Sequence, residues 1–99
     1  MSEYKSKLKS EQMDFLCDAV LSLKNKQECY RFFEDIFTIN EIKAIEQRLQ
    51  VAKMLKDKRT YADIATATGA STATISRVNR CINYGADGYN IVLARLEEK

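Results

Sequence analysis

The stretch YADIATATGASTATISRVNR, residues 61–80, differs in composition from the rest of the chain. Its side chains are mostly small and uncharged, whereas charged residues make up 30% of the whole sequence, and two arginines stand near its end. A helix-turn-helix needs a small residue where its helices cross and a turn residue that tolerates positive φ. Ala65 and Gly69 meet both needs, so the stretch predicts a helix-turn-helix over about residues 60–83.

The second helix of this motif has a pattern that favours DNA binding. A helix that enters the major groove needs short side chains where it approaches the base edges and cations where the phosphates pass. Its first amides add a positive partial charge toward phosphate. The alternative is that the small residues only let two helices pack tightly, with both arginines solvated. The candidate DNA-contacting residues are Ser71, Thr72, Ala73, Ser76, Arg77 and Arg80.

On both sides of this motif the sequence predicts further helices and an all-α fold. Proline is absent and glycine occurs only three times, so few residues break a helix. N-caps are expected at Asn25, Thr38, Thr60 and Ser71. The six expected helices cover about residues 8–23, 25–37, 38–58, 60–68, 71–83 and 89–98.

Apolar residues at helical spacing are expected to align on one face of the first helix, to form the centre of the core in the third, and to pack inward in the last. They are Phe15, Leu16, Ala19, Val20 and Leu23 in the first helix, Ile42, Ile45, Leu49, Ala52 and Leu55 in the third, and Ile91, Leu93, Ala94 and Leu96 in the last.

Composition limits the function classes. With 99 residues the chain is expected to form a single domain, and its net charge of +2 permits nucleic-acid contact without arguing for it alone. Histidine is absent, and the three cysteines lack a metal-binding spacing, so we expect no enzyme and no metal site. There is no membrane-length apolar run, and the lysine-rich start does not resemble a secretory signal. A cytoplasmic location is therefore expected.

Residues 37–83 resemble the tryptophan repressor family, and within it a group of small bacterial Trp-repressor-like proteins. The resemblance rests on FTINEIKAIEQRLQVAKML, residues 37–55, and YADIATATGASTATISR, residues 61–77. It implies an intertwined homodimer in which the first, second, third and last helices of two chains share one core. The alternative is that these helices form the core of a monomer.

The resemblance also implies an effector pocket, in which the family holds tryptophan between two arginines. The positions that correspond are Thr38, Arg48, Thr74, Arg77 and Val78. The family has glycine at the last of these, and the isopropyl group of valine occupies the space that the indole needs. Three alternatives therefore stay open: tryptophan despite Val78, a smaller or differently shaped effector between Arg48 and Arg77, or no effector, and the last two are favoured; we expect no cofactor.

For three of these positions the sequence also allows a role without an effector. Arg48 has two acidic neighbours in sequence, Glu41 and Glu46, with which it could form an ion pair. Thr38 has a sufficient structural role as a helix cap, and Thr74 could face the DNA groove.

Two functional hypotheses follow. The first is a sequence-specific DNA-binding transcriptional regulator, a repressor that recognises a nearly palindromic operator on double-stranded DNA. The second is a helical protein-interaction module of the transcription machinery that does not recognise DNA. The modest net charge favours the second, as do Ala62 and Ala65, which stand where the family has basic residues.

Overall fold

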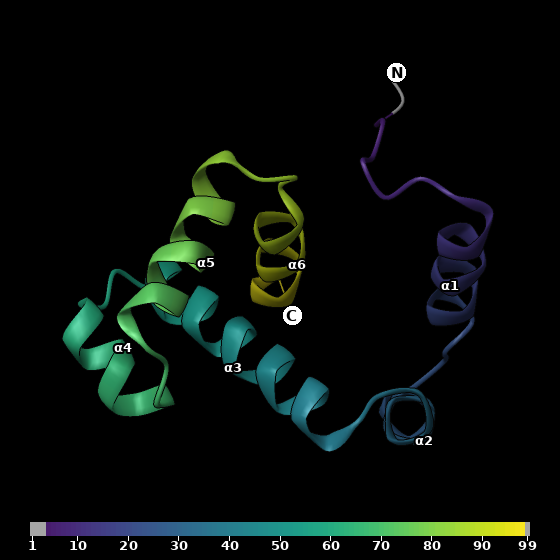
Figure 1. Ribbon diagram of the computed structural model, residues 1–99, viewed down its shortest axis with the longest axis horizontal. Helices are drawn as coiled ribbons and strands as arrows, with labels where there is room; N and C mark the ends of the chain where they lie inside the picture. The colour runs from purple at the N-terminus through teal and green to yellow at the C-terminus, as the bar shows by residue number, and fades with distance from the viewer. Residues whose placement is uncertain (1–3, 99) are drawn as a thin grey trace. The chain divides into compact units, whose positions relative to one another are not determined.

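In a computed structural model of the protein, which describes residues 4–98, all regular structure is α-helical (Figure 1). The helices are α1 (Glu11–Leu21), α2 (Lys26–Ile36), α3 (Ile39–Lys56), α4 (Tyr61–Thr68), α5 (Thr72–Tyr84) and α6 (Gly88–Glu97). The predicted all-α fold with six helices is therefore confirmed for these residues. Within them, no helix is both long enough and apolar enough to cross a membrane.

Side-chain caps determine where most of the helices begin. Asn25, Thr38, Thr60 and Ser71 each accept a hydrogen bond from the main-chain N–H three residues later, as predicted. At Thr38 the cap is reciprocal, because Glu41 also accepts from the Thr38 N–H at 2.9 Å. Such caps satisfy N–H groups that lack a partner within the helix.

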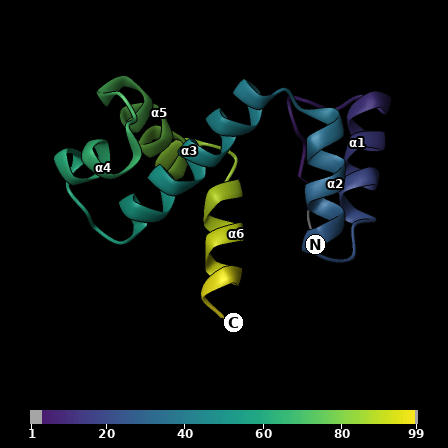
Figure 2. The same ribbon diagram turned by 90° about the horizontal axis from the view of Figure 1, so that it is seen from below.

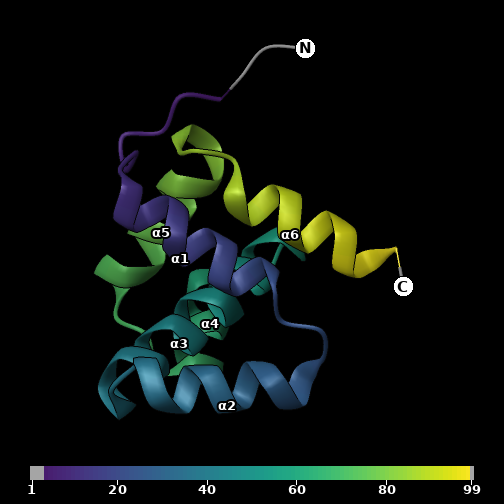
Figure 3. The same cartoon turned by 90° about the vertical axis from the view of Figure 1, so that its right-hand side faces the viewer.

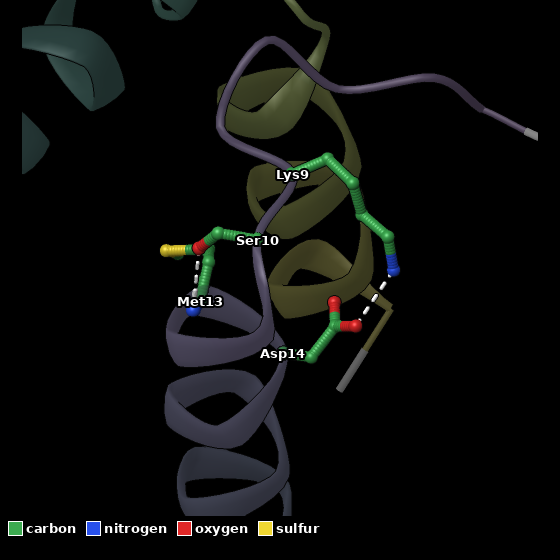
Figure 4. Close-up of polar contacts among 4 residues, drawn as sticks. All are labelled: Lys9, Ser10, Met13 and Asp14. Carbon is green, nitrogen blue, oxygen red and sulfur yellow. Dashed lines mark hydrogen bonds and ion pairs between the residues drawn. The ribbon is translucent and has the colours of Figure 1, made fainter.

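The start of α1 differs from the prediction. Leu8 lies before the helix, and the N-cap is Ser10, whose hydroxyl accepts a 3.0 Å hydrogen bond from the N–H of Met13 (Figure 4). An ion pair of 2.6 Å between Lys9 and Asp14 also bridges the chain before the helix to its first turn. The cap therefore starts the helix at Glu11, after the first apolar residue of the periodic pattern.

The chain divides into two compact units, Met1–Phe37 and Thr38–Lys99. The first contains α1 and α2, and the second contains α3 to α6. The assignment of residues 1–99 to a single Trp-repressor-like domain stays a prediction.

Neither helix of the first unit contains a buried residue. Figure 3 shows α1 and α2 as two continuous helices. The side chains of Phe15, Leu21 and Tyr30 are 77%, 82% and 70% exposed. Phe15, Leu16 and Val20, which the sequence places on one apolar face of the first helix, are therefore exposed in the single chain. Periodicity correctly identified the apolar face, but the single chain does not bury it.

The second unit has a compact apolar core. Helix α3 packs against α4, α5 and α6, and α5 lies between α4 and α6 (Figures 1 and 2). Because α3 contacts all three neighbours, its C-terminal half supplies the centre of the core. The buried residues are Val51, Ala52, Ile64, Ala70, Ile75, Val78 and Leu93.

Several predicted core residues of this unit are exposed. On α3, Ile45 and Leu49 are 36% and 41% exposed, although Ala52 is fully buried. On α6 only Leu93 is buried, so the prediction is wrong for the other three α6 residues in the single chain. The single chain buries α3 only at Val51 and Ala52 and α6 only at Leu93, a narrower stripe than the apolar residues of either helix cover.

Candidate nucleic-acid interface

A tight turn joins α4 to α5. Gly69 ends α4 with φ +74°, and its N–H donates to the carbonyl of Ala65 at 2.9 Å. An added Cβ at Gly69 would meet nothing within 4 Å, so glycine is favoured there by the left-handed backbone and not by crowding. This is the turn geometry that the sequence predicts for a helix-turn-helix.

Thr68 reinforces this turn with its side chain. Its hydroxyl donates to the carbonyl of Ile64 at 2.7 Å and accepts from the N–H of Ala70 at 3.1 Å. The methyl group of Ala70 is then buried in the core, only 5% exposed. The turn is therefore held by hydrogen bonds on its polar side and by packing on its apolar side.

Helix α5 has a buried face and an exposed face. Ile75 and Val78, three residues apart, are 0% and 1% exposed and pack with the α3 and α4 core. The opposite side of the helix, with its short side chains and two arginines, is left to solvent. All of the predicted DNA-contacting residues are exposed: Ser71, Thr72, Ala73, Ser76, Arg77 and Arg80.

The hydroxyl of Ser71 has a structural role at the start of α5. It accepts from the N–H of Thr74 at 3.1 Å and lies 3.1 Å from the Thr74 hydroxyl, to which it donates. A hydroxyl used in this way has less capacity to bond a base edge. Thr72 and Ser76 are the other candidate residues with a hydroxyl group. Within residues 4–98, neither of these hydroxyls has such a local partner.

A contact that the sequence did not predict joins the helix-turn-helix to α3. The side-chain amide of Gln47 donates to the main-chain carbonyl of Thr68 at 3.2 Å. Both residues line a hollow of about 350 Å³ between α3 and α4, together with Lys43, Glu46 and Gln50. Because the partners are 21 residues apart, no local pattern could have revealed this contact.

Comparison with known proteins identifies the family. The profile of the Trp repressor protein family matches residues 11–97. The chain belongs to the Trp repressor family. The predicted resemblance is therefore confirmed, and it extends well beyond residues 37–83.

Relatives of this Trp repressor family member come from bacteria. YerC of Bacillus subtilis strain 168, an uncharacterised protein, is 56% identical over 92 residues, which cover 93% of this chain and 88% of YerC. A TrpR-like protein from Eubacterium eligens ATCC 27750 has a crystal structure that matches with a TM-score of 0.88 and 60% identity, over 92% of this chain and 94% of that one. A candidate Trp repressor from Staphylococcus aureus matches with a TM-score of 0.88 and 52% identity, over 94% and 93%.

In this family member, the positions that correspond to the effector pocket are in different environments. Val78 lies in the apolar core, whereas Arg48 and Arg77 are exposed. The Thr38 hydroxyl caps α3, and the half-buried Thr74 hydroxyl accepts from Ser71. Two of these five side chains thus have a defined local hydrogen bond, and Val78 has a packing role.

The suggested ion pair of Arg48 is not formed. Glu46 instead lies 3.8 Å from Lys43, and Glu41 belongs to the cap of α3. Among the ion pairs of residues 4–98, none contains Arg48. The alternative in which Arg48 pairs with Glu41 or Glu46 is therefore not found in the single chain within residues 4–98.

Proposed function

We propose that the protein is a sequence-specific DNA-binding transcriptional regulator, a repressor that inserts α5 into the major groove of its operator. The observation that best supports this proposal is the two-sided character of α5. Its buried face fixes the helix to α3 and α4, while its exposed face presents short side chains followed by Arg77 and Arg80. A recognition helix needs this division, because it must be held rigidly from behind while it approaches the bases closely.

The roles of individual residues follow from their positions along α5. Thr72, Ala73 and Ser76 lie in the first turns, and their short side chains let the helix approach the base edges. Arg77 and Arg80 lie further along the helix and contact phosphates, which contributes affinity more than sequence preference. Ser71 contributes mainly by capping the helix that bears these residues.

We propose that the protein functions as a homodimer. Neither α1 nor α2 buries a residue, and large apolar side chains such as Phe15 and Leu21 are mostly exposed. An exposed apolar surface of this kind is typical of an interface, and a two-fold dimer covers it with an identical surface. The two recognition helices would then meet half-sites about one DNA turn, ~34 Å, apart.

Membership of a family of bacterial regulators supports this function over an enzymatic one. We propose that the protein acts on DNA in the bacterial cytoplasm, without a catalytic step and without a cofactor. The competing hypothesis is a protein-interaction module, favoured by the absence of any cation on α4, where Asp63 is the charged residue.

Selection of bound duplexes from a random DNA pool, at low salt and without added ligand, tests the proposal. A two-fold symmetric enriched motif is the expected result. Arg77→Ala should then weaken binding to all duplexes, whereas Thr72→Ala should change the preferred sequence more than the overall affinity. No enrichment, together with duplex affinity that does not change with salt, would instead support the protein-interaction module.

A further inference from the structure

The C-terminus of α3 ends in a backbone conformation that usually requires glycine. The N–H of Lys58 donates to the carbonyl of Leu55, and the N–H of Arg59 donates to the carbonyl of Met54, both at 3.1 Å. This pair of hydrogen bonds places Lys58 in the left-handed region, with φ +65°. The arrangement is a Schellman motif, in which the left-handed residue is most often glycine.

The next helix of the same unit shows the usual choice. Helix α4 also ends on a left-handed residue, but that residue is Gly69, with φ +74°. An L-amino acid with a side chain is disfavoured in this region, because its Cβ crowds the backbone. Lysine therefore stands at position 58 at the expense of backbone strain, and strain retained at a charged surface residue points to a function of that side chain.

The acidic groups beside Lys58 are already paired with other cations. Both carboxylate oxygens of Asp57 accept from Lys53, at 3.0 and 2.7 Å, and this contact raises the pKa of Lys53 above its usual value. Asp63 lies 3.7 Å from Arg59. Lys58 is exposed and forms no ion pair within residues 4–98, so its charge is available to an external anion.

The position of this charge matches the place where a helix-turn-helix meets the DNA backbone. Residue 58 lies in the turn that leads from α3 into α4, the first helix of the helix-turn-helix (Figures 1 and 2). The first helix of a helix-turn-helix crosses the phosphate backbone, but α4 has no cation of its own.

We propose that Lys58 binds a backbone phosphate of the operator and so supplies, from the turn, the cation that α4 lacks. This inference rests on the proposed DNA-binding function. It assigns to Lys58 a contact that is independent of base sequence, so its loss should affect all duplexes alike.

Lys58→Gly provides an unusually clean test, because it removes the charge while relieving the strained backbone. Its urea unfolding midpoint should equal or exceed that of the parent, so weaker binding could not be attributed to unfolding. Affinity for both the selected motif and random duplex should fall. The slope of log affinity against log salt should decrease by about 0.9, the value for one phosphate contact. Lys58→Arg should retain the parent slope.

Arg95→Gln is the matched control, because it makes the same change in net charge on α6 and should leave the slope unchanged. If Lys58→Gly binds with the slope of the parent, the inference about Lys58 is wrong while the DNA-binding function stands. If the parent itself shows no salt-dependent binding to duplex DNA, the proposed function fails, and the Lys58 contact fails with it.

Discussion

The side-chain amide of Gln47 donates a 3.2 Å hydrogen bond to the main-chain carbonyl of Thr68, the last residue of α4. The carbonyls at a helix C-terminus have no partner within their own helix, so this bond satisfies one of them from α3. It also joins the central helix to the turn that positions α5. Gln47 is therefore a positioning residue for α5, the proposed recognition helix.

Gln47→Met should loosen this turn. Methionine has nearly the same shape but no donor, and the loss of one partly buried hydrogen bond should lower the free energy of unfolding by about 1 kcal/mol. Amide hydrogen exchange at Gly69 and Ala70 should become faster. Gln50→Met is the control, because Gln50 lines the same hollow but is not expected to hold the turn. Equal effects of the two substitutions would contradict the role of Gln47.

Substitutions at Ser71 should separate helix capping from DNA contact. Ser71→Ala removes the cap of α5 and should cost about 1 kcal/mol of stability, with weaker DNA binding as a consequence. Ser71→Asn restores a good cap with a different side chain and should recover both stability and binding. Urea unfolding and duplex titration measure the two effects. If Ser71→Asn were stable but could not bind DNA, Ser71 would be a direct DNA contact.

The buried Val78 predicts that tryptophan does not bind to the parent protein. Titration calorimetry at millimolar tryptophan should give no saturable heat, because the isopropyl group is packed in the core. Val78→Gly should cost about 3 kcal/mol, through lost packing and lower helix propensity. Val78→Ala should cost less, since it retains a methyl group. A saturable heat with the parent would show that Val78 does not fill the effector space.

The exposed apolar side chains of α1 predict that the protein self-associates through its first unit. Sedimentation equilibrium of the parent should give twice the chain mass of 11.4 kDa. The double substitution of Phe15 and Leu21 to aspartate should produce monomers, because burying two charges in an apolar interface is unfavourable. Gln12→Asp places a charge on the same helix at a polar position and should retain the dimer. A monomeric parent would contradict the proposed assembly.

Local signals in the sequence predicted the helix starts well. Asn25, Thr38, Thr60 and Ser71 were identified because a capping hydrogen bond spans only three residues. Gly69 was identified as the turn because glycine is the residue that this backbone favours. The start of α1 was missed because an apolar residue, Leu8, fits the helical spacing before the true cap.

Features that depend on distant parts of the chain could not be predicted. Apolar spacing identified the face of α1 correctly, but it contains no information on whether the same chain covers that face. The hydrogen bond from Gln47 to Thr68 depends on how α3 and α4 pack. Nothing in the sequence indicated the left-handed backbone of Lys58, because glycine, the residue that normally marks such a turn, is absent there.

Among residues 4–98, the buried residues all lie between Val51 and Leu93, and none lies in α1 or α2. The apolar core behind α5 is therefore built from residues of the second unit. In evolution the exposed residues of α1 and α2 can change without altering that core. If the proposed dimer and DNA contact are correct, duplicated copies of such a gene could acquire separate partner preferences while still recognising the same DNA site.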